Sequence, residues 1–191
     1  EQALTRARFH CHRFATGQDA AQWLAVECSG KTVGIGGSMT AKAMKLEELL
    51  PLTSTVYWHW LTPGPETLAN AATAQVYLTS VNALAETGEL INIDGTGNRV
   101  GAMCYGPGTV YVLIGRNKIV SGGYAQAVKR IKEIACPQNA RRQHLRSPCA
   151  ETGHCNPARC EESMCRVTVA FDHAPGGKRT QVVLINEDLG Y

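Results

Sequence analysis

The chain has 191 residues, of which 44% are hydrophobic, with a formal net charge of +3 and eight cysteines. This is the composition of an ordinary globular protein and excludes a disordered or fibrous chain. The basic residues are spread along the sequence, which argues against nucleic-acid binding, and no apolar run approaches the ~20 residues that a membrane span needs.

The first half of the chain predicts alternating helices and strands. Apolar residues recur at helical spacing over 20–27, and a buried strand is expected at 31–35 before a glycine-rich turn and a further helical stretch. Strands are also expected at 55–58 and 75–79, with a helix that starts at Pro65 between them. This alternation is typical of βαβ units and predicts an α/β fold, an open sheet with flanking helices.

The second half begins with a loop, which we expect between residues 82 and 88. Strands follow at 90–93 and 109–114, and the second of these is apolar enough to lie in the centre of a sheet. A helix is predicted over 124–135, and Pro137 is expected to end it because proline cannot continue the hydrogen-bond ladder of a helix.

The composition changes between Pro137 and Cys165, where almost no aliphatic residue occurs. Such a stretch cannot bury enough apolar surface to order itself, so something else must order it. Beyond it, 167–171 and 181–185 predict a C-terminal β-hairpin. We interpret residues 1–191 as a single domain with a cysteine-rich, metal-binding loop at 137–165.

Four cysteines crowd into this loop, namely Cys149, Cys155, Cys160 and Cys165, with five, four and four residues between them. No secretory leader opens the sequence, so we expect a cytoplasmic, reducing compartment, where crowded cysteines favour a metal over disulfides. Four thiolates suit zinc or an iron–sulfur cluster, and the absence of two-residue knuckles weakens the case for zinc. Disulfides or free thiols are the alternative. Cys136 ends a predicted helix and is interpreted as a buried thiol.

The glycine-rich turn Gly36-Gly37-Ser38-Met39-Thr40 joins a predicted strand to a helix. Glycines let backbone amides approach an anion, and the hydroxyl of Ser38 or Thr40 could contact a ligand or cap the helix. A plain capped turn is the alternative interpretation.

Polar residues also follow the strands at 90–93 and 109–114. In open α/β sheets, ligands bind beyond the carboxyl ends of strands, where a carboxylate or an amine can act as acid or base and a guanidinium can bind a carboxylate or phosphate. We therefore predict a site for a small anionic substrate, with ordinary turns as the alternative. The candidate catalytic residues are Asp94, Glu86 and Lys118, and the candidate substrate-binding residues are Gly36, Gly37, Ser38, Thr40, Asn82, Gly97, Asn98, Arg99 and Asn117.

Several segments together resemble the LUD family, the lactate utilization protein C-like or DUF162-type proteins, over nearly the whole chain. The resemblance rests on 36–40, 82–84, 88–100, 115–120, 148–149, 152–153, Cys155, Cys165 and 187–191. It implies a fold similar to the NagB/RpiA/CoA-transferase superfamily and a link to the oxidation of lactate to pyruvate alongside iron–sulfur partner proteins. It also favours a [4Fe-4S] cluster on the four loop cysteines, although the family places the third of these two residues earlier, at Ala158.

Three hypotheses for the function follow. The first is an iron–sulfur protein of lactate or related organic-acid metabolism that transfers electrons with partner subunits. The second is an enzyme that performs acid–base or group-transfer chemistry on a carboxylate or phosphate, with a metal-stapled loop. The third is a zinc-stapled binding module, and a homo-oligomeric assembly is compatible with all three.

Overall fold

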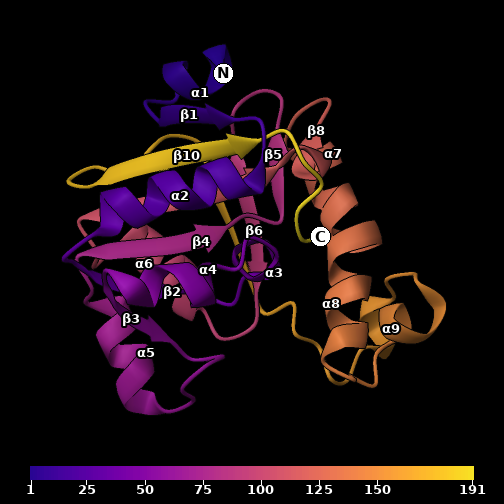
Figure 1. The fold of residues 1–191 in the computed structure, drawn as a ribbon. Helices are drawn as coiled ribbons and strands as arrows, with labels where there is room; N and C mark the ends of the chain where they lie inside the picture. The colour runs from indigo at the N-terminus through magenta and orange to yellow at the C-terminus, as the bar shows by residue number, and fades with distance from the viewer.

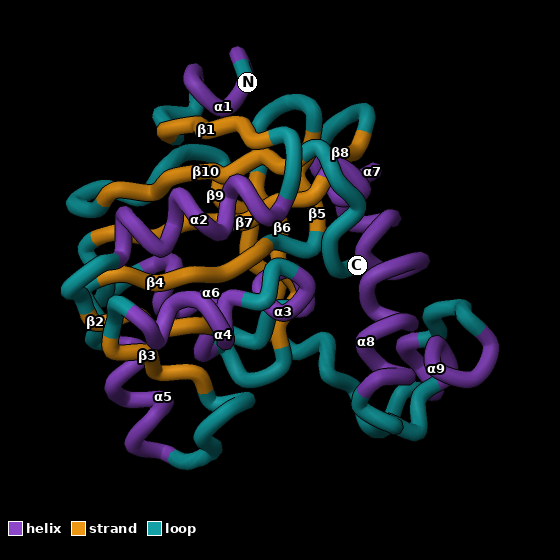
Figure 2. The backbone as a smooth tube through the Cα atoms, in the orientation of Figure 1, coloured by secondary structure: helices purple, strands orange, loops and turns teal.

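The computed structural model describes residues 1–191 and contains two β-sheets with helices packed around them (Figures 1 and 2). Sheet A has six parallel strands in the order β1-β10-β7-β4-β2-β3. Its strands are β1 (His10–Phe14), β2 (Thr32–Ile35), β3 (Thr55–Trp58), β4 (Val76–Ser80), β7 (Thr109–Gly115) and β10 (Arg179–Ile185). The predicted α/β fold, a parallel sheet flanked by helices, is confirmed.

Sheet B has four short strands in the order β8-β5-β6-β9 and is antiparallel except for the β5–β8 pair. Its strands are β5 (Ala83–Ala85), β6 (Leu90–Asp94), β8 (Ile119–Val120) and β9 (Val167–Phe171). The α-helices are α1 (Gln2–Arg6), α2 (Gly17–Cys28), α3 (Met39–Ala43), α4 (Leu46–Leu49), α5 (Pro65–Ala72), α6 (Asn98–Cys104), α7 (Tyr124–Arg130), α8 (Cys136–Arg142) and α9 (Pro148–Thr152). Short 3-10 helices occur at Leu50–Leu52, Arg116–Lys118 and Pro157–Arg159.

The core is layered, because successive side chains of a strand point to opposite faces. In β7, Tyr111 and Leu113 pack with α2 and α4 on one face of sheet A, whereas Val110 and Val112 pack on the other face against sheet B and α6. A third cluster fills the space between sheet B and the helical column, which is the continuous helical segment from α7 through Ile131–Ala135 to α8. Sheet A is therefore buried on both faces, as the apolar pattern of its central strand predicts.

The predicted C-terminal β-hairpin is wrong. Strand β10 is inserted between β1 and β7 in sheet A, and strand β9 pairs with β6 in sheet B. The two segments are both strands, as predicted, but their partners lie far away in the sequence. The segment 82–88 also differs from the prediction, because strand β5 occupies part of the loop expected there.

The prediction that Pro137 ends a helix is also wrong. The chain passes from α7 through a π-helical turn, Ile131–Ala135, into α8, and Pro137 lies in the first turn of α8. Proline has no N–H and is tolerated in the first turn of an α-helix. The π turn directly before it interrupts the ordinary α-helical hydrogen-bond pattern at that point. The cysteine-rich segment thus begins as a helix, and Figure 2 shows α8 and α9 together in a lobe beside the sheets.

Candidate functional site

A cavity of about 250 Å³ lies at the carboxyl ends of strands β2, β4 and β6, where sheet A meets the cysteine-rich lobe. Strand ends line one side, and the column from the π turn to α8 lines the other. The lining residues are Gly37, Ser38, Met39, His59, Trp60, Ser80, Val81, Asn82, Ile93, Asp94, Gly95, Thr96, Asn98, Arg99, Lys118, Ala135, Cys136, Asn139, Arg142, Gln143, Met164, Cys165 and Tyr191. The cavity brings together many of the predicted anion-binding residues and one of the predicted metal ligands.

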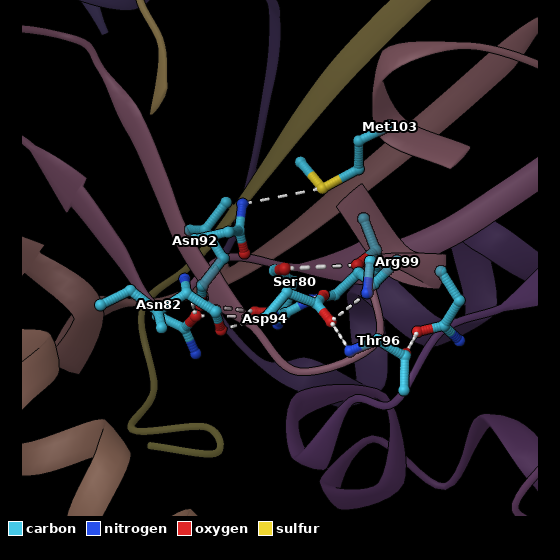
Figure 3. Close-up of polar contacts among 12 residues, drawn as sticks. Ser80, Asn82, Asn92, Asp94, Thr96, Arg99 and Met103 are labelled. Atoms are coloured by element: carbon cyan, nitrogen blue, oxygen red, sulfur yellow. Dashed lines mark hydrogen bonds and ion pairs between the residues drawn. The ribbon is translucent and has the colours of Figure 1, made fainter. Parts of the chain in front are cut away.

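Asp94 and Arg99 form a buried ion pair in the cavity wall (Figure 3). Arg99 Nε donates to Asp94 Oδ2 at 3.0 Å, and Arg99 Nη2 donates to the Ile93 carbonyl at 3.0 Å and to Asn82 Oδ1 at 3.2 Å. The other carboxylate oxygen, Oδ1, accepts from the backbone amides of Thr96 and Gly97.

Burial raises the pKa of Asp94, but the Arg99 charge and these hydrogen bonds outweigh it, so the pKa is lowered from its ordinary value. Asp94 is therefore an ionised carboxylate whose oxygens already have partners. This geometry suits the positioning of Arg99 and of the turn better than proton transfer.

Lys118 is almost completely buried, with 3% of its surface exposed. Its Nζ donates to Thr40 Oγ1 at 2.8 Å, to Ser80 Oγ at 2.9 Å and to the Val81 carbonyl at 3.2 Å. Burial, together with the charges of Arg130 and Arg99, lowers its pKa to about 7. The amine is thus near the balance point between its charged and neutral forms at neutral pH, which is the property expected of a general base.

The helical column contributes a wall that we did not predict. The guanidinium of Arg142 lies 4.9 Å from the centre of the Trp60 ring, and its Nε donates to Tyr191 Oη at 2.8 Å. Tyr191 in turn donates to Asn139 Oδ1 at 3.0 Å. Trp60, Arg142 and Tyr191 lie far apart in the sequence, so no local motif could have indicated that they share a site.

The electrostatics of the lining favour an anion. Three basic side chains, Arg99, Arg142 and Lys118, line the cavity, and the single carboxylate among the lining residues, that of Asp94, is already paired. Burial lowers the pKa of His59, so its imidazole adds a neutral polar group, and its Nδ1 has no hydrogen-bond partner.

Of the predicted catalytic and substrate-binding residues, Glu86, Asn117, Gly36, Thr40 and Gly97 do not line the cavity. Glu86, a candidate catalytic residue, is exposed after β5, where its backbone amide donates to the carbonyls of Val120 and Gly122, and the structure does not bring it to the cavity. Asn117 instead holds the C-terminal segment, because its side chain donates to the Gly190 carbonyl and accepts from the Leu189 amide.

The glycine-rich turn reaches the cavity through Gly37 and Ser38. Ser38 Oγ accepts from the Ala41 amide at 3.1 Å as the N-cap of α3, which is the plain alternative considered for this residue. Gly36 and Thr40 lie behind the lining: a Cβ at Gly36 would be 2.9 Å from Tyr77 Oη, and Thr40 is one of the acceptors of Lys118. Asn98 lines the cavity and Gly97 contributes its amide to Asp94.

The cysteine-rich lobe contains a close pair of thiols that includes a residue we did not select. Cys136 Sγ and Cys165 Sγ are 3.4 Å apart, and both residues line the cavity. The hydrogen bond from Cys136 and the nearby Lys132 ammonium lower the pKa of Cys165. Cys149 is buried, with its Sγ 3.5 Å from Ser147 Oγ, whereas Cys155 is exposed.

These thiols are suitable donors for a soft metal centre, but they do not close around one point. No group of three or more His, Cys, Asp or Glu side chains in the structure is arranged to hold a metal ion. The donor chemistry nevertheless suits a soft metal, because five thiols lie on the segment from Cys136 to Cys165 and two of them, those of Cys136 and Cys165, are 3.4 Å apart. The metal site at Cys149, Cys155, Cys160 and Cys165 stays a prediction.

The fold and the cavity define an α/β protein with a cationic, ligand-sized cavity beside a thiol-rich lobe. The chain belongs to the LUD domain family, whose model matches residues 1–185, and this confirms the family resemblance. The family is associated with lactate utilization. No curated protein matches the sequence.

Among solved structures, the crystal structure of a DUF162 family protein from Deinococcus radiodurans has a similar fold, with a TM-score of 0.54. The two chains are 14% identical, and the match covers 97% of this chain and 93% of the other, so the likeness concerns the fold alone. None of the helices combines the length and apolar character needed to cross a membrane.

Proposed function

We propose that the chain is an iron–sulfur protein of lactate or related organic-acid metabolism that binds a small carboxylate in the cavity between sheet A and the cysteine-rich lobe. One observation carries this proposal: a single cavity is lined both by basic side chains and by the adjacent thiols of Cys136 and Cys165. A carboxylate in this cavity would lie next to the segment that supplies the thiolates.

The size and polarity of the cavity support a small acid. Its volume of about 250 Å³ is just below the range of roughly 300–1,000 Å³ for sites of drug-sized ligands, which suits a molecule of a few non-hydrogen atoms. Arg142 lies at the exposed edge of the cavity, and Arg99 is held at its wall by Asp94 and Asn82. In both residues Nε and Nη2 already donate to protein atoms, which leaves Nη1 to donate a charge-assisted hydrogen bond to the acid.

The cluster ligands in this proposal are Cys149, Cys155, Cys160 and Cys165. Four thiolates suit both common iron–sulfur clusters, and a bound cluster would supply one-electron chemistry beside the carboxylate. Binding would also order a segment that has almost no aliphatic residues, because the free energy of metal binding becomes folding free energy. Partner proteins would receive or supply the electrons.

A second candidate is acid–base enzymology at Lys118. The observation in its favour is the pKa of about 7, which gives a substantial fraction of neutral amine at neutral pH. Under this alternative the thiolate centre has a structural role and stabilises the cysteine-rich lobe, and Lys118 exchanges a proton with the bound acid.

The test begins with protein purified without oxygen. Iron and acid-labile sulfide should be present, with a visible absorption band and a paramagnetic resonance signal that change on addition of dithionite. Protein without iron would overturn the iron–sulfur proposal, and zinc in place of iron would support the zinc-stapled module instead.

Calorimetric titration tests the cavity separately. Lactate or pyruvate should bind, whereas lactamide, which has the shape of lactate without its charge, should bind far more weakly because the basic residues are left without an anion. Equal affinity for lactate and lactamide would contradict an anion site.

A further inference from the structure

Lys118 is the one lysine among the residues that line the cavity. Its Nζ contacts two hydroxyls and a backbone carbonyl, and it forms no ion pair with a carboxylate. A lysine amine that is desolvated and lies near other cations is activated as a nucleophile toward carbonyl groups. We propose that Lys118 forms an imine with the carbonyl group of a small 2-oxo acid bound in the cavity; this inference rests on the proposed function, which includes the binding of a small carboxylate there.

The surroundings of the amine favour its neutral, nucleophilic form. Lys118 is 3% exposed, so its charged form loses most of its hydration, and the guanidinium groups of Arg130 and Arg99 repel the added proton. The carboxylate of Asp94 is paired with Arg99. The pKa of Lys118 is therefore lowered to about 7, and a substantial fraction of the amine has a free lone pair at neutral pH.

Two hydroxyls beside the amine can move the protons that imine formation requires. Thr40 Oγ1 and Ser80 Oγ lie 2.8 and 2.9 Å from Nζ and 3.2 Å from each other. Ser80 also lines the cavity. Because a hydroxyl both donates and accepts, Ser80 can take a proton from the attacking nitrogen and pass one to the departing oxygen.

The covalent step needs no further reactant. The lone pair of Nζ attacks the carbonyl carbon and forms a C–N bond, and one proton passes from the nitrogen to the oxygen, which gives a carbinolamine. The second proton follows, the C–O bond breaks, and the nitrogen forms a double bond to the carbon. Both protons of the amine thus leave with the carbonyl oxygen as water, and nothing is oxidised or reduced.

The two parts of a 2-oxo acid have separate roles in the cavity. Arg142 and Arg99 line the same cavity as Lys118, so a small acid that is bound by its carboxylate has its neighbouring carbon close to the other lining groups. Lactate has a hydroxyl where pyruvate has the carbonyl. Both acids can therefore bind, whereas only pyruvate can form the imine.

The experiment incubates the full chain, purified without oxygen, with pyruvate and sodium cyanoborohydride, which reduces an imine to a stable secondary amine. Mass spectrometry of the intact chain and of its peptides then locates the adduct. We expect a single pyruvate adduct on Lys118, none with lactate in place of pyruvate, and none in Lys118→Met.

The matched control is Lys178→Arg. The Lys178 amine also donates to backbone carbonyls, those of Ala102 and Met103, and burial lowers its pKa too, but it does not line the cavity. The control variant should form the adduct as readily as wild type.

An unmodified Lys118 in protein that binds pyruvate overturns the inference, and so does equal labelling of Lys118 and Lys178. If Lys118→Met fails to fold, the peptide map of the wild type still decides which lysine reacts. Absence of pyruvate binding in calorimetry would instead refute the proposed carboxylate site, so the two failures are distinguishable.

Discussion

The amine of Lys118 donates a 2.8 Å hydrogen bond to the hydroxyl of Thr40, which ties the turn after β7 to helix α3 behind the cavity wall. The hydroxyls of Thr40 and Ser80 also donate onward to backbone carbonyls of Leu189 and Leu113. The amine is therefore the centre of a buried network that connects the glycine-rich turn, the end of β4 and the C-terminal segment.

This network predicts an unusual dependence of stability on pH. The pKa of Lys118 is about 7 in the folded chain but about 10.4 in the unfolded chain, so between these values the unfolded state binds the extra proton. The contribution of Lys118 to the free energy of unfolding should thus rise by up to about 1.4 kcal/mol per pH unit from pH 7 toward pH 10, and stay constant below pH 7.

The measurement is urea unfolding of wild type and Lys118→Met from pH 6 to pH 9.5. The difference in unfolding free energy should grow with pH in favour of wild type. Parallel curves would show that Lys118 keeps an ordinary pKa in the folded protein.

The Asp94–Arg99 ion pair predicts a second effect. Asp94→Asn leaves Arg99 without its carboxylate in a largely buried position, so we expect a loss of about 3 kcal/mol of unfolding free energy at pH 7. The folded pKa of Asp94 is lowered, so below about pH 4 the unfolded chain takes up a proton that the folded chain does not. The loss should therefore shrink as the pH falls, and it should disappear once the pH is below the lowered folded pKa.

The matched control is Asp188→Asn. Asp188 pairs with Arg116 at 2.8 Å, but both side chains are more than half exposed, so its loss should cost under about 1 kcal/mol. Equal losses for the two variants would refute a special role for the buried pair.

Arg142 of α8 lines the cavity and is exposed, so its substitution should affect binding but not folding. Arg142→Ala removes an exposed cation that stacks on Trp60, so the stability should change little. Lactate affinity should fall by about 10- to 150-fold, because a hydrogen bond to a charged group contributes roughly 1.5–3 kcal/mol. Arg116→Ala, outside the cavity, should leave the affinity unchanged; calorimetry that finds the same affinity in both variants would contradict this role of Arg142.

The glycine before the cavity wall predicts a steric effect. A Cβ at Gly36 would lie 2.9 Å from Tyr77 Oη and 3.4 Å from Arg99 Cγ, and the Tyr77 side chain is too buried to move aside. Gly36→Ala should therefore cost about 1–3 kcal/mol of unfolding free energy and weaken lactate binding by displacing Arg99.

Gly101 provides the comparison, because it lies in α6 with open space where a Cβ would stand. Gly101→Ala should be neutral or stabilise by up to about 1 kcal/mol, since alanine favours helix. Thermal unfolding of the two variants should separate clearly, and a Gly36→Ala variant as stable as wild type would show that the turn adapts.

The sequence predicted elements well where the pattern is local. Strand β3 was predicted at its observed bounds, and α5 begins at Pro65 as expected, because periodicity and proline placement act over a few residues. The errors concern long-range pairing. Nothing in the residues of β9 and β10 indicates that each prefers a distant partner over its neighbour, and the short connection around Gly176 made a hairpin the simplest expectation.

The candidate site shows the same division. Arg99, Asp94 and Asn82 were found because polar residues follow apolar strands, and the structure brings their side chains together. Trp60 and Arg142 were missed because each is ordinary in its local sequence. A helix that ends at Pro137 would leave Cys136 an ordinary buried thiol, whereas the π turn Ile131–Ala135 continues the helix past it and brings Cys136 to the cavity.

The position of β10 has a consequence for how the chain is made. Because this strand lies between β1 and β7, the first strand of sheet A has no partner until residues 179–185 are available. During synthesis β1 must wait for almost the entire chain, and such non-local pairing slows folding. Truncation of the protein from its C-terminal side into β10 would not remove an edge strand, because it would leave β1 without a partner and expose the edge of β7. The insertion of β10 is therefore the step that completes sheet A.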